Sequence, residues 1–179
     1  GALMPRRKLE RRAQAARWIN AALVGVTALA MGMLIVLAIR TVEVERTGRA
    51  QAERTSEIIS ELRDISRSAL NGETGQRGYM LSFDRRYLAP YFAGRDRVEP
   101  SLRRLRTLVE PGASARQLAL LDQIEVLTRT KFAELAQGVA LVQSGDINEA
   151  RRLVLTDEGQ EAMERLRRAI RELEAIEIQ

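Results

Sequence analysis

The side chains that could do chemistry in this sequence gather in one stretch, from Asn71 to Tyr91. Glu73 and Arg77 stand four residues apart, a spacing that places a carboxylate and a guanidinium on one face of a helix. Such a pair can bind a small anion or another polar ligand. The two side chains can equally pair with each other and cap neighbouring helix ends, and this structural role is the one we favour.

Aromatic residues and glycines surround this pair. Tyr79, Tyr87 and Tyr91 either line a recognition pocket or, as we prefer, plug the end of the hydrophobic core with their hydroxyl groups in water. Three glycines spaced three residues apart are expected to line one helix face and to let a neighbouring helix approach closely. The residues of this motif that we expect to be structural are Gly72, Gly75, Gly78 and Pro90.

The residue types needed for most catalytic sites are missing. The chain contains no histidine and no cysteine. This excludes a Ser-His-Asp triad, the common histidine metal sites and a phospho-accepting histidine within the chain. Asp146 and Glu149 are expected to cap a helix, because two carboxylates without a third partner make a poor metal site. Without a nucleophile–base pair or a phosphate-binding loop, we expect no catalytic site, no cofactor and no metal.

The positive charge is concentrated at one end of the chain. Of the net charge of +5, residues 1–40 contribute +6, from seven basic side chains and one acidic one, and the remaining residues contribute −1. A protein that binds nucleic acid would spread the excess over a folded surface. Here it flanks an apolar segment, which indicates a membrane and no nucleic-acid partner.

Residues 18–39 form an uncharged run of 22 residues that predicts a transmembrane helix. At 1.5 Å per residue the run spans roughly 33 Å, close to the ~30 Å of a hydrocarbon core. Trp18 stands where an interfacial aromatic residue belongs. A cleaved signal peptide would have a shorter apolar region followed by a small-residue cleavage site, which residues 40–43 do not offer. We therefore expect one retained span in a lipid bilayer.

The distribution of basic residues predicts how the chain is oriented. Residues 1–17 form a basic tail, in which residues 1–4 are expected to be a remnant of cloning ahead of a natural start at Met4. Because the basic residues lie mostly before the anchor, the N-terminus is expected in the cytoplasm. In a bacterium, the chain would then sit in the inner membrane with residues 40–179 in the periplasm.

The remaining pattern predicts an all-α fold, with an up-down-up-down four-helix bundle in residues 40–179. The first helix is expected from residue 41 to about 81 and the second from about 85 to 110. Ser114 with Gln117 is a capping-box pattern that opens the third helix. Asp146 with Glu149 is a second such pattern, which opens a fourth helix with an expected break near residues 156–159.

The path of the first helix through Asn71-Gly72 has two interpretations. Taken alone, this dipeptide is a turn signal. A helix that continues through it would instead end near Ser82, with Asp84 as the N-cap of the next helix. We prefer the continuing helix.

Two apolar patterns suggest a homodimer. A seam at steps of four, three and four residues in the first helix resembles a coiled coil, and small residues in the anchor permit close helix contact. The seam residues are Ile58, Leu62, Ile65 and Ala69, and the small residues are Gly25, Ala28 and Gly32.

The residues from Glu73 to Leu81, reading ETGQRGYML, followed by Asp84, Tyr87-Leu88 and Pro90-Tyr91, resemble the signature of the third class of CHASE domains. The closing part is similar as well, with Gly145-Asp146 before Ala150 and with Gly159 before Met163 and Arg167. The resemblance covers roughly residues 45–177.

This resemblance implies a function in signalling. CHASE domains are extracellular sensor domains ahead of histidine kinases, cyclases and chemoreceptors, and the third class implies a four-helix periplasmic bundle between two membrane spans. We therefore expect the signal-input domain of a sensor histidine kinase, with an unknown small-molecule or protein stimulus, and a second span and an output domain beyond residue 179. The alternative is a passive dimerisation or spacer module of a membrane-anchored cyclase or chemoreceptor.

Overall fold

The structure, a computed structural model, describes residues 6–179 except for the side chains of residues 6–9 and 157–158. It divides into two units, Gly1–Gln51 and Ala52–Gln179. The described residues form helices and connecting turns and contain no β-strand. The predicted cloning remnant, residues 1–4, lies outside the described residues.

The first unit is the N-terminal part of α1 (Arg6–Ser82). Its most apolar 18-residue window has a mean hydropathy of 2.6, and none of that window is buried within the protein. It is the one helix in the described part of the chain that is long and apolar enough to span a membrane. The hydroxyl of Thr27, one of its few polar side chains, donates a hydrogen bond to the carbonyl of Leu23 at 3.0 Å, so this group is satisfied within its own helix.

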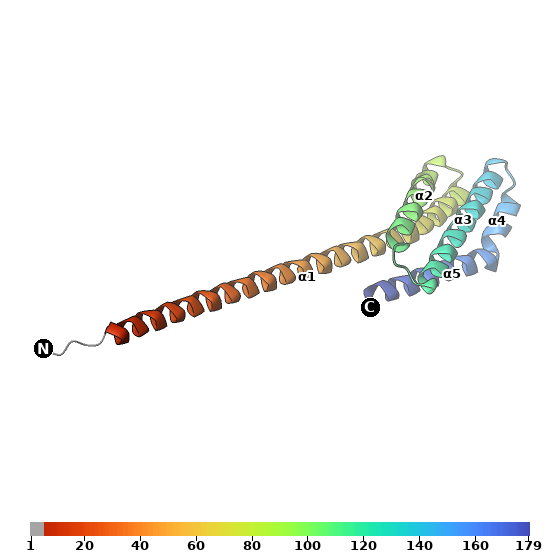
Figure 1. The fold of residues 1–179 in the computed structure, drawn as a ribbon. Coiled ribbons are helices and arrows are strands. Elements are labelled where there is room, and N and C mark those ends of the chain that lie inside the picture. Colours follow the sequence, from red (N-terminus) through yellow and green to blue (C-terminus); the bar gives the residue numbers. More distant parts are fainter. Residues whose placement is uncertain (1–5) are drawn as a thin grey trace. The chain divides into compact units, whose positions relative to one another are not determined.

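The second unit is a bundle of antiparallel helices (Figure 1). The end of α1 is followed by the 3₁₀ helix η1 (Arg85–Leu88), α2 (Ala89–Val109), α3 (Ala115–Gln143), α4 (Ile147–Leu155) and α5 (Asp157–Ile178). Together α4 and α5 form the fourth helical segment of the bundle. This segment is interrupted at Thr156, whose backbone is extended with a ψ of 137°. The predicted all-α class is confirmed, and the break falls within the predicted residues 156–159.

The turn at the end of α1 lies where the sequence predicts it. The helix passes through Asn71-Gly72 without interruption and ends at Ser82. Asp84 then accepts a hydrogen bond from the backbone N–H of Arg86 at 2.9 Å and caps η1. The second helix, predicted from about residue 85, begins at Arg85 with one turn of 3₁₀ helix, and its α-helical part starts at Ala89. Pro90 stands in the first turn of α2 and has no N–H to donate, so it favours an α-helix that starts at Ala89.

The other helix ends follow local rules. Ser114 and Gln117 form the predicted capping box, with bonds of 3.2 and 2.8 Å. The N–H groups of Gly145 and Asp146 donate hydrogen bonds to the carbonyls of Val142 and Leu141, respectively. This pair of hydrogen bonds ends a helix when the residue after its C-cap has a left-handed conformation. Gly145 has a φ of +85°, which a glycine adopts without strain.

The second predicted capping box forms only in part. Asp146 accepts from the backbone N–H of Glu149 at 3.3 Å, but the Glu149 carboxylate pairs with Arg152 at 2.8 Å instead of returning to Asp146. The i,i+3 ion pair within one helical turn competes for the same carboxylate. Asp146 is therefore a cap, as predicted, without the reciprocal bond.

The core of the bundle contains the apolar seam of every helix. On α1, Ile58, Leu62, Ile65 and Ala69 are all fully buried among residues of the same chain. The sequence pattern correctly predicts that these side chains are buried. They are not exposed for contact with a second copy, so the seam does not support the predicted dimer in the way that the sequence suggested.

One long side chain on α1 caps a neighbouring helix. The guanidinium of Arg54 donates to the carbonyls of Leu108 at 2.7 Å, Val109 at 3.3 Å and Pro111 at 2.9 Å. The carbonyls of Leu108 and Val109 lie in the last turn of α2, where they have no partner within their own helix, and that of Pro111 lies just beyond it. Arg54 therefore fastens α1 to the end of α2.

Candidate functional site

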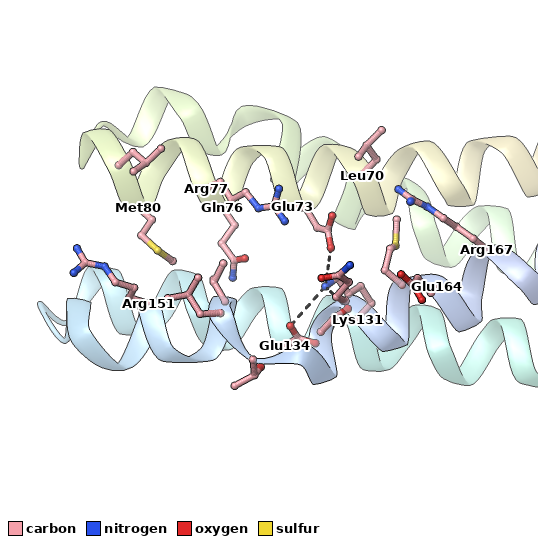
Figure 2. Close-up of a pocket in the computed structure, with 17 residues that line it drawn as sticks. Leu70, Glu73, Gln76, Arg77, Met80, Lys131, Glu134, Arg151, Glu164 and Arg167 are labelled. Carbon is pink, nitrogen blue, oxygen red and sulfur yellow. Dashed lines mark hydrogen bonds and ion pairs between the residues drawn. The ribbon is translucent and has the colours of Figure 1, made fainter.

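A cavity of about 800 Å³ lies between α1, α3, α4 and α5. The cavity adjoins the break between α4 and α5, since Thr156 and Gly159 are among the residues that line it. In α4, Ala150 is the only buried residue of the nine, so this short helix leaves a space instead of closing the bundle. Figure 2 shows the charged side chains that face this space from four helices.

The floor of the cavity is a buried ion cluster. The ammonium of Lys131 on α3 lies 2.8 Å from a carboxylate oxygen of Glu73 on α1 and 3.6 Å from one of Glu134 on α3. It also donates to the carbonyl of Gly159 on α5 at 3.3 Å. Lys131 is only 4% exposed. One cation therefore joins α1, α3 and α5 at the floor of the cavity.

The predicted pairing of Glu73 with Arg77 is wrong. The carboxylate of Glu73 pairs with Lys131, and Arg77 makes no ion pair with any carboxylate that the structure describes. The physical reason is the difference in burial. An ion pair gains more when it is shielded from water, and Lys131 is buried whereas Arg77 is exposed. Helical spacing alone cannot show that Lys131 competes with Arg77 for the Glu73 carboxylate.

A buried amide completes the floor. The side-chain nitrogen of Gln76 donates to the carbonyl of Leu135 at 3.2 Å and links α1 to α3 one turn away from Lys131. A Cβ atom at Gly138 would clash with this amide, so the glycine makes room for it. Likewise, a Cβ atom at Gly159 would lie 2.5 Å from the Glu134 carboxylate. Both glycines leave space for polar groups at the floor of the cavity.

Three residues of the site were not among those predicted from the sequence: Lys131, Gln76 and Glu134. One signal for Lys131 was available: the chain has 29 basic residues, of which only Lys8 and Lys131 are lysines. Lys131 also stands four residues from both Leu127 and Leu135, on one apolar face of the third predicted helix. A lone lysine on the buried face of a helix in an arginine-rich chain indicates a paired, buried ammonium.

The rim of the cavity is positively charged and partly apolar. Arg77, Arg151 and Arg167 come from α1, α4 and α5, and Figure 2 shows Arg77 between the other two. None of the three forms an ion pair with a carboxylate in the described part of the chain. Leu81 and Leu155 also line the cavity and are 84% and 73% exposed.

The three tyrosines lie away from the cavity. Tyr79 and Tyr91 are buried in the core of the bundle, whereas Tyr87 is about half exposed. None of them lines the cavity. Of the predicted ligand-binding residues, the structure therefore brings only Glu73 and Arg77 to this site.

The three glycines of the motif permit close contact with two different neighbouring segments: Gly72 with α3, and Gly75 and Gly78 with the segment of η1 and α2. A Cβ atom at Gly72 would lie 2.7 Å from the side chain of Leu135 on α3. At Gly75 it would lie 2.9 Å from the backbone nitrogen of Tyr91, and at Gly78 it would lie 2.8 Å from the ring of Tyr87. The prediction of a single face is wrong because each step of three residues rotates by about 300°, so the direction drifts around the helix.

No three metal-ligating side chains gather at the cavity or elsewhere among the described residues. The Glu73 and Glu134 carboxylates share an ammonium ion. The described side chains of the site offer charged and apolar contacts for binding.

Comparison with known proteins identifies the family. The family model of the CHASE3 domain matches residues 49–179. The crystal structure of the Rhodopseudomonas palustris histidine kinase HK9 sensor domain is similar, with a TM-score of 0.61 and 24% sequence identity over 68% of this chain and 94% of that chain. At this identity the likeness shows the fold. No curated protein sequence matches the chain. The resemblance predicted from the residues between Glu73 and Tyr91 is confirmed: the chain belongs to the CHASE3 family, and its role is that of a sensor domain.

Proposed function

We propose that residues 52–179 are the periplasmic signal-input domain of a membrane-anchored sensor histidine kinase. The observation that carries this proposal is the Lys131 cluster, because one buried cation joins three helices beside a cavity. One of these helices, α1, also contains the apolar segment that is able to span a membrane. A stimulus that changes the packing around the cavity thus acts on the helix that enters the membrane.

Two further observations support the membrane orientation and the output. The basic residues that precede the apolar segment favour an N-terminus in the cytoplasm, which leaves the bundle in the periplasm. The similar solved structure is titled as a histidine kinase sensor domain. We therefore favour a histidine kinase over a cyclase or a chemoreceptor as the output.

The mechanism is a shift between two packings of the helices. Packed helices exchange between discrete arrangements more readily than they deform continuously. Lys131 contacts the carbonyl of Gly159 just beyond the interruption at Thr156, where α5 begins. A change in the charges around Lys131 would alter the position of α5 against α1, and α1 would pass the change across the membrane.

Replacement of Arg77 by alanine is expected to change signal output without unfolding the bundle. Arg77 is exposed at the rim of the cavity, so its loss removes charge from the site and little packing. The experiment joins residues 1–179 to the second span and kinase of a well-characterised receptor and measures autophosphorylation in membranes. We expect a change of about fivefold or more, which corresponds to a coupling free energy within the usual range of about 1–3 kcal/mol.

The matched control is Arg103→Ala, on the exposed surface of α2 outside the cavity, which should leave output unchanged. If Arg77→Ala lowers the helicity by circular dichroism, the residue is structural. If deletion of residues 85–155 leaves the regulation of output intact, the bundle is a passive spacer and the proposed function is wrong.

We also propose that the chain forms a homodimer through its membrane-proximal part. The seam of α1 is buried within the bundle, so the contact has to involve other residues. At Gly25 and Gly32 no heavy atom lies within 4 Å of the position that a Cβ atom would occupy, which leaves their surface open to a second helix.

Single cysteines at each position from 41 to 51 test this dimer, in a chain that contains no cysteine of its own. We expect disulfide crosslinking in membranes to peak every three to four residues, because one face of the helix would meet its copy. Cysteines at Ile58 and Leu62 serve as buried controls and should not crosslink. Uniform or absent crosslinking along the segment would count against the dimer.

A further inference from the structure

The cavity has the size and depth of a small-molecule site. Its volume of about 800 Å³ lies within the range of roughly 300–1,000 Å³ that is typical of ligand pockets. Its floor is formed by buried groups, among them Lys131, Gln76 and Met163, and its rim by exposed ones. A ligand can therefore enter from solvent and reach groups that are fixed by the bundle.

The charges that line the cavity favour an anion. Among the described lining side chains, four are cationic and three are acidic. Lys131 already neutralises Glu73 and Glu134 in part at the floor. This leaves the guanidinium groups of Arg77, Arg151 and Arg167 with Glu164 as the remaining described acid of the lining. The described lining as a whole therefore carries one excess positive charge, which lies at the rim, and a concave site with a positive excess attracts anions.

Other arginines on α4 and α5, which lie outside the cavity, form ion pairs with glutamates of their own helix. Arg152 pairs with Glu149 at 2.8 Å and Arg165 pairs with Glu161 at 3.2 Å, and neither arginine lines the cavity. In contrast, Arg151 and Arg167 face the cavity without an ion pair to any described carboxylate. Arg103 and Arg171 also lack such a partner and lie outside the cavity, so what distinguishes the cavity is that three of these cations, Arg77, Arg151 and Arg167, line one concave site.

The apolar part of the lining favours a ligand with a hydrophobic body. Leu70, Leu81 and Leu155 line the cavity and are 48%, 84% and 73% exposed, so a ligand that covers them removes apolar surface from water. Met80 and Met163 lie on the same walls. Methionine side chains are flexible and adapt to the shape of a bound molecule.

We infer that this cavity binds a small amphipathic organic anion. Its acid group lies at the guanidinium of Arg77, between Arg151 and Arg167, and its apolar body lies against the leucines and methionines of the walls. The inference rests on the proposed function, since it names the class of molecule that the input domain senses. It assigns to Arg77 the role of binding the negatively charged group of the ligand.

The test compares two probes that have the same shape and differ in charge, naphthalene-2-carboxylate and naphthalene-2-carboxamide. Each is titrated by calorimetry into residues 1–179 in detergent micelles, with the heat of titration into empty micelles subtracted. The carboxylate is expected to bind at about one site per chain, and the amide about tenfold more weakly, because a charge-assisted hydrogen bond is lost.

Two variants test whether Arg77 binds the carboxylate group. Arg77→Gln should weaken binding of the carboxylate about tenfold and leave binding of the amide unchanged. Arg103→Gln, outside the cavity, should change neither. Thermal melting by circular dichroism verifies that both variants fold. Equal binding of the two probes, no saturable binding of the carboxylate, or an unaffected Arg77→Gln variant would each overturn the inference.

The receptor chimera separates this inference from the proposed function. If the carboxylate binds in an Arg77-dependent way while autophosphorylation stays unchanged at saturation, the inference holds and the proposed function fails. If neither probe binds while Arg77→Ala still changes output, the proposed function holds and the inference about ligand class fails.

Discussion

Replacement of Lys131 by methionine is expected to lower the free energy of unfolding of the bundle by about 3–5 kcal/mol. Methionine matches the length of the lysine stem and fills the same space, so little packing is lost. What is lost is the ammonium, which leaves the Glu73 and Glu134 carboxylates in a partly buried site without their cation. The carbonyl of Gly159 also loses its donor.

A double-mutant cycle distinguishes loss of charge from loss of shape. Glu73→Gln alone should destabilise the bundle, because it weakens the closest contact of a buried ammonium. Combined with Lys131→Met, it removes the stranded carboxylate, so the double variant should be more stable than the sum of the two single changes predicts. Urea unfolding of residues 1–179 in detergent, followed by circular dichroism, measures all four proteins.

The control for this cycle is Arg129→Met, which removes an exposed cation from α3. Arg129 pairs with Glu99 at 2.9 Å at the surface, and its guanidinium holds the pKa of that carboxyl below its usual value. Pairs of this kind contribute little, so the change should stay below about 1 kcal/mol. If Lys131→Met costs no more than this control, the cluster does not hold the three helices together.

Features set by neighbouring residues could be predicted from the sequence. The uncharged run of residues 18–39 requires no knowledge of the fold, because its length and composition alone match a bilayer. The capping box of Ser114 and Gln117 forms within one turn. The family signature between Glu73 and Tyr91 is also local. All three predictions depend on spacing along the chain, which the sequence contains.

The cavity and its ion cluster could not be predicted, because they join residues far apart in the chain. Glu73 has a favourable partner four residues away in Arg77, yet it pairs with Lys131, 58 residues away. The outcome depends on which cation is shielded from water, and burial follows from the packing of α3 against α1. A helical pattern gives the possible local partners and leaves the distant ones unknown.

The seam of α1 shows a second limit. The spacing of Ile58, Leu62, Ile65 and Ala69 correctly predicts a buried stripe, and all four are fully buried. The same spacing suits a coiled coil between two copies and a bundle within one chain. The pattern therefore establishes that the stripe is covered without saying by which chain.

The second large effect is expected at Gly94, where the backbones of α2 and α1 come close together. A Cβ atom at this position would lie 2.6 Å from the backbone carbonyl oxygen of Ser68. A backbone carbonyl in a helix cannot rotate aside, so the two helices have to move apart along a contact that includes the buried Ser68 and Ala69. Gly94→Ala should therefore destabilise the bundle by about 1–3 kcal/mol, as overpacking does, although alanine is intrinsically the better helix former.

The same substitution at two other glycines shows whether the close approach is the cause. At Gly78 the Cβ atom would lie 2.8 Å from the half-exposed side chain of Tyr87 and not against a helix backbone, so Gly78→Ala should have a smaller effect. At Gly48 no heavy atom lies within 4 Å, and Gly48→Ala should leave the unfolding transition of the bundle unchanged. Equal losses at all three positions would mean that the glycines act through backbone flexibility. A loss confined to Gly94 means that α1 and α2 are held at a separation that only a glycine permits.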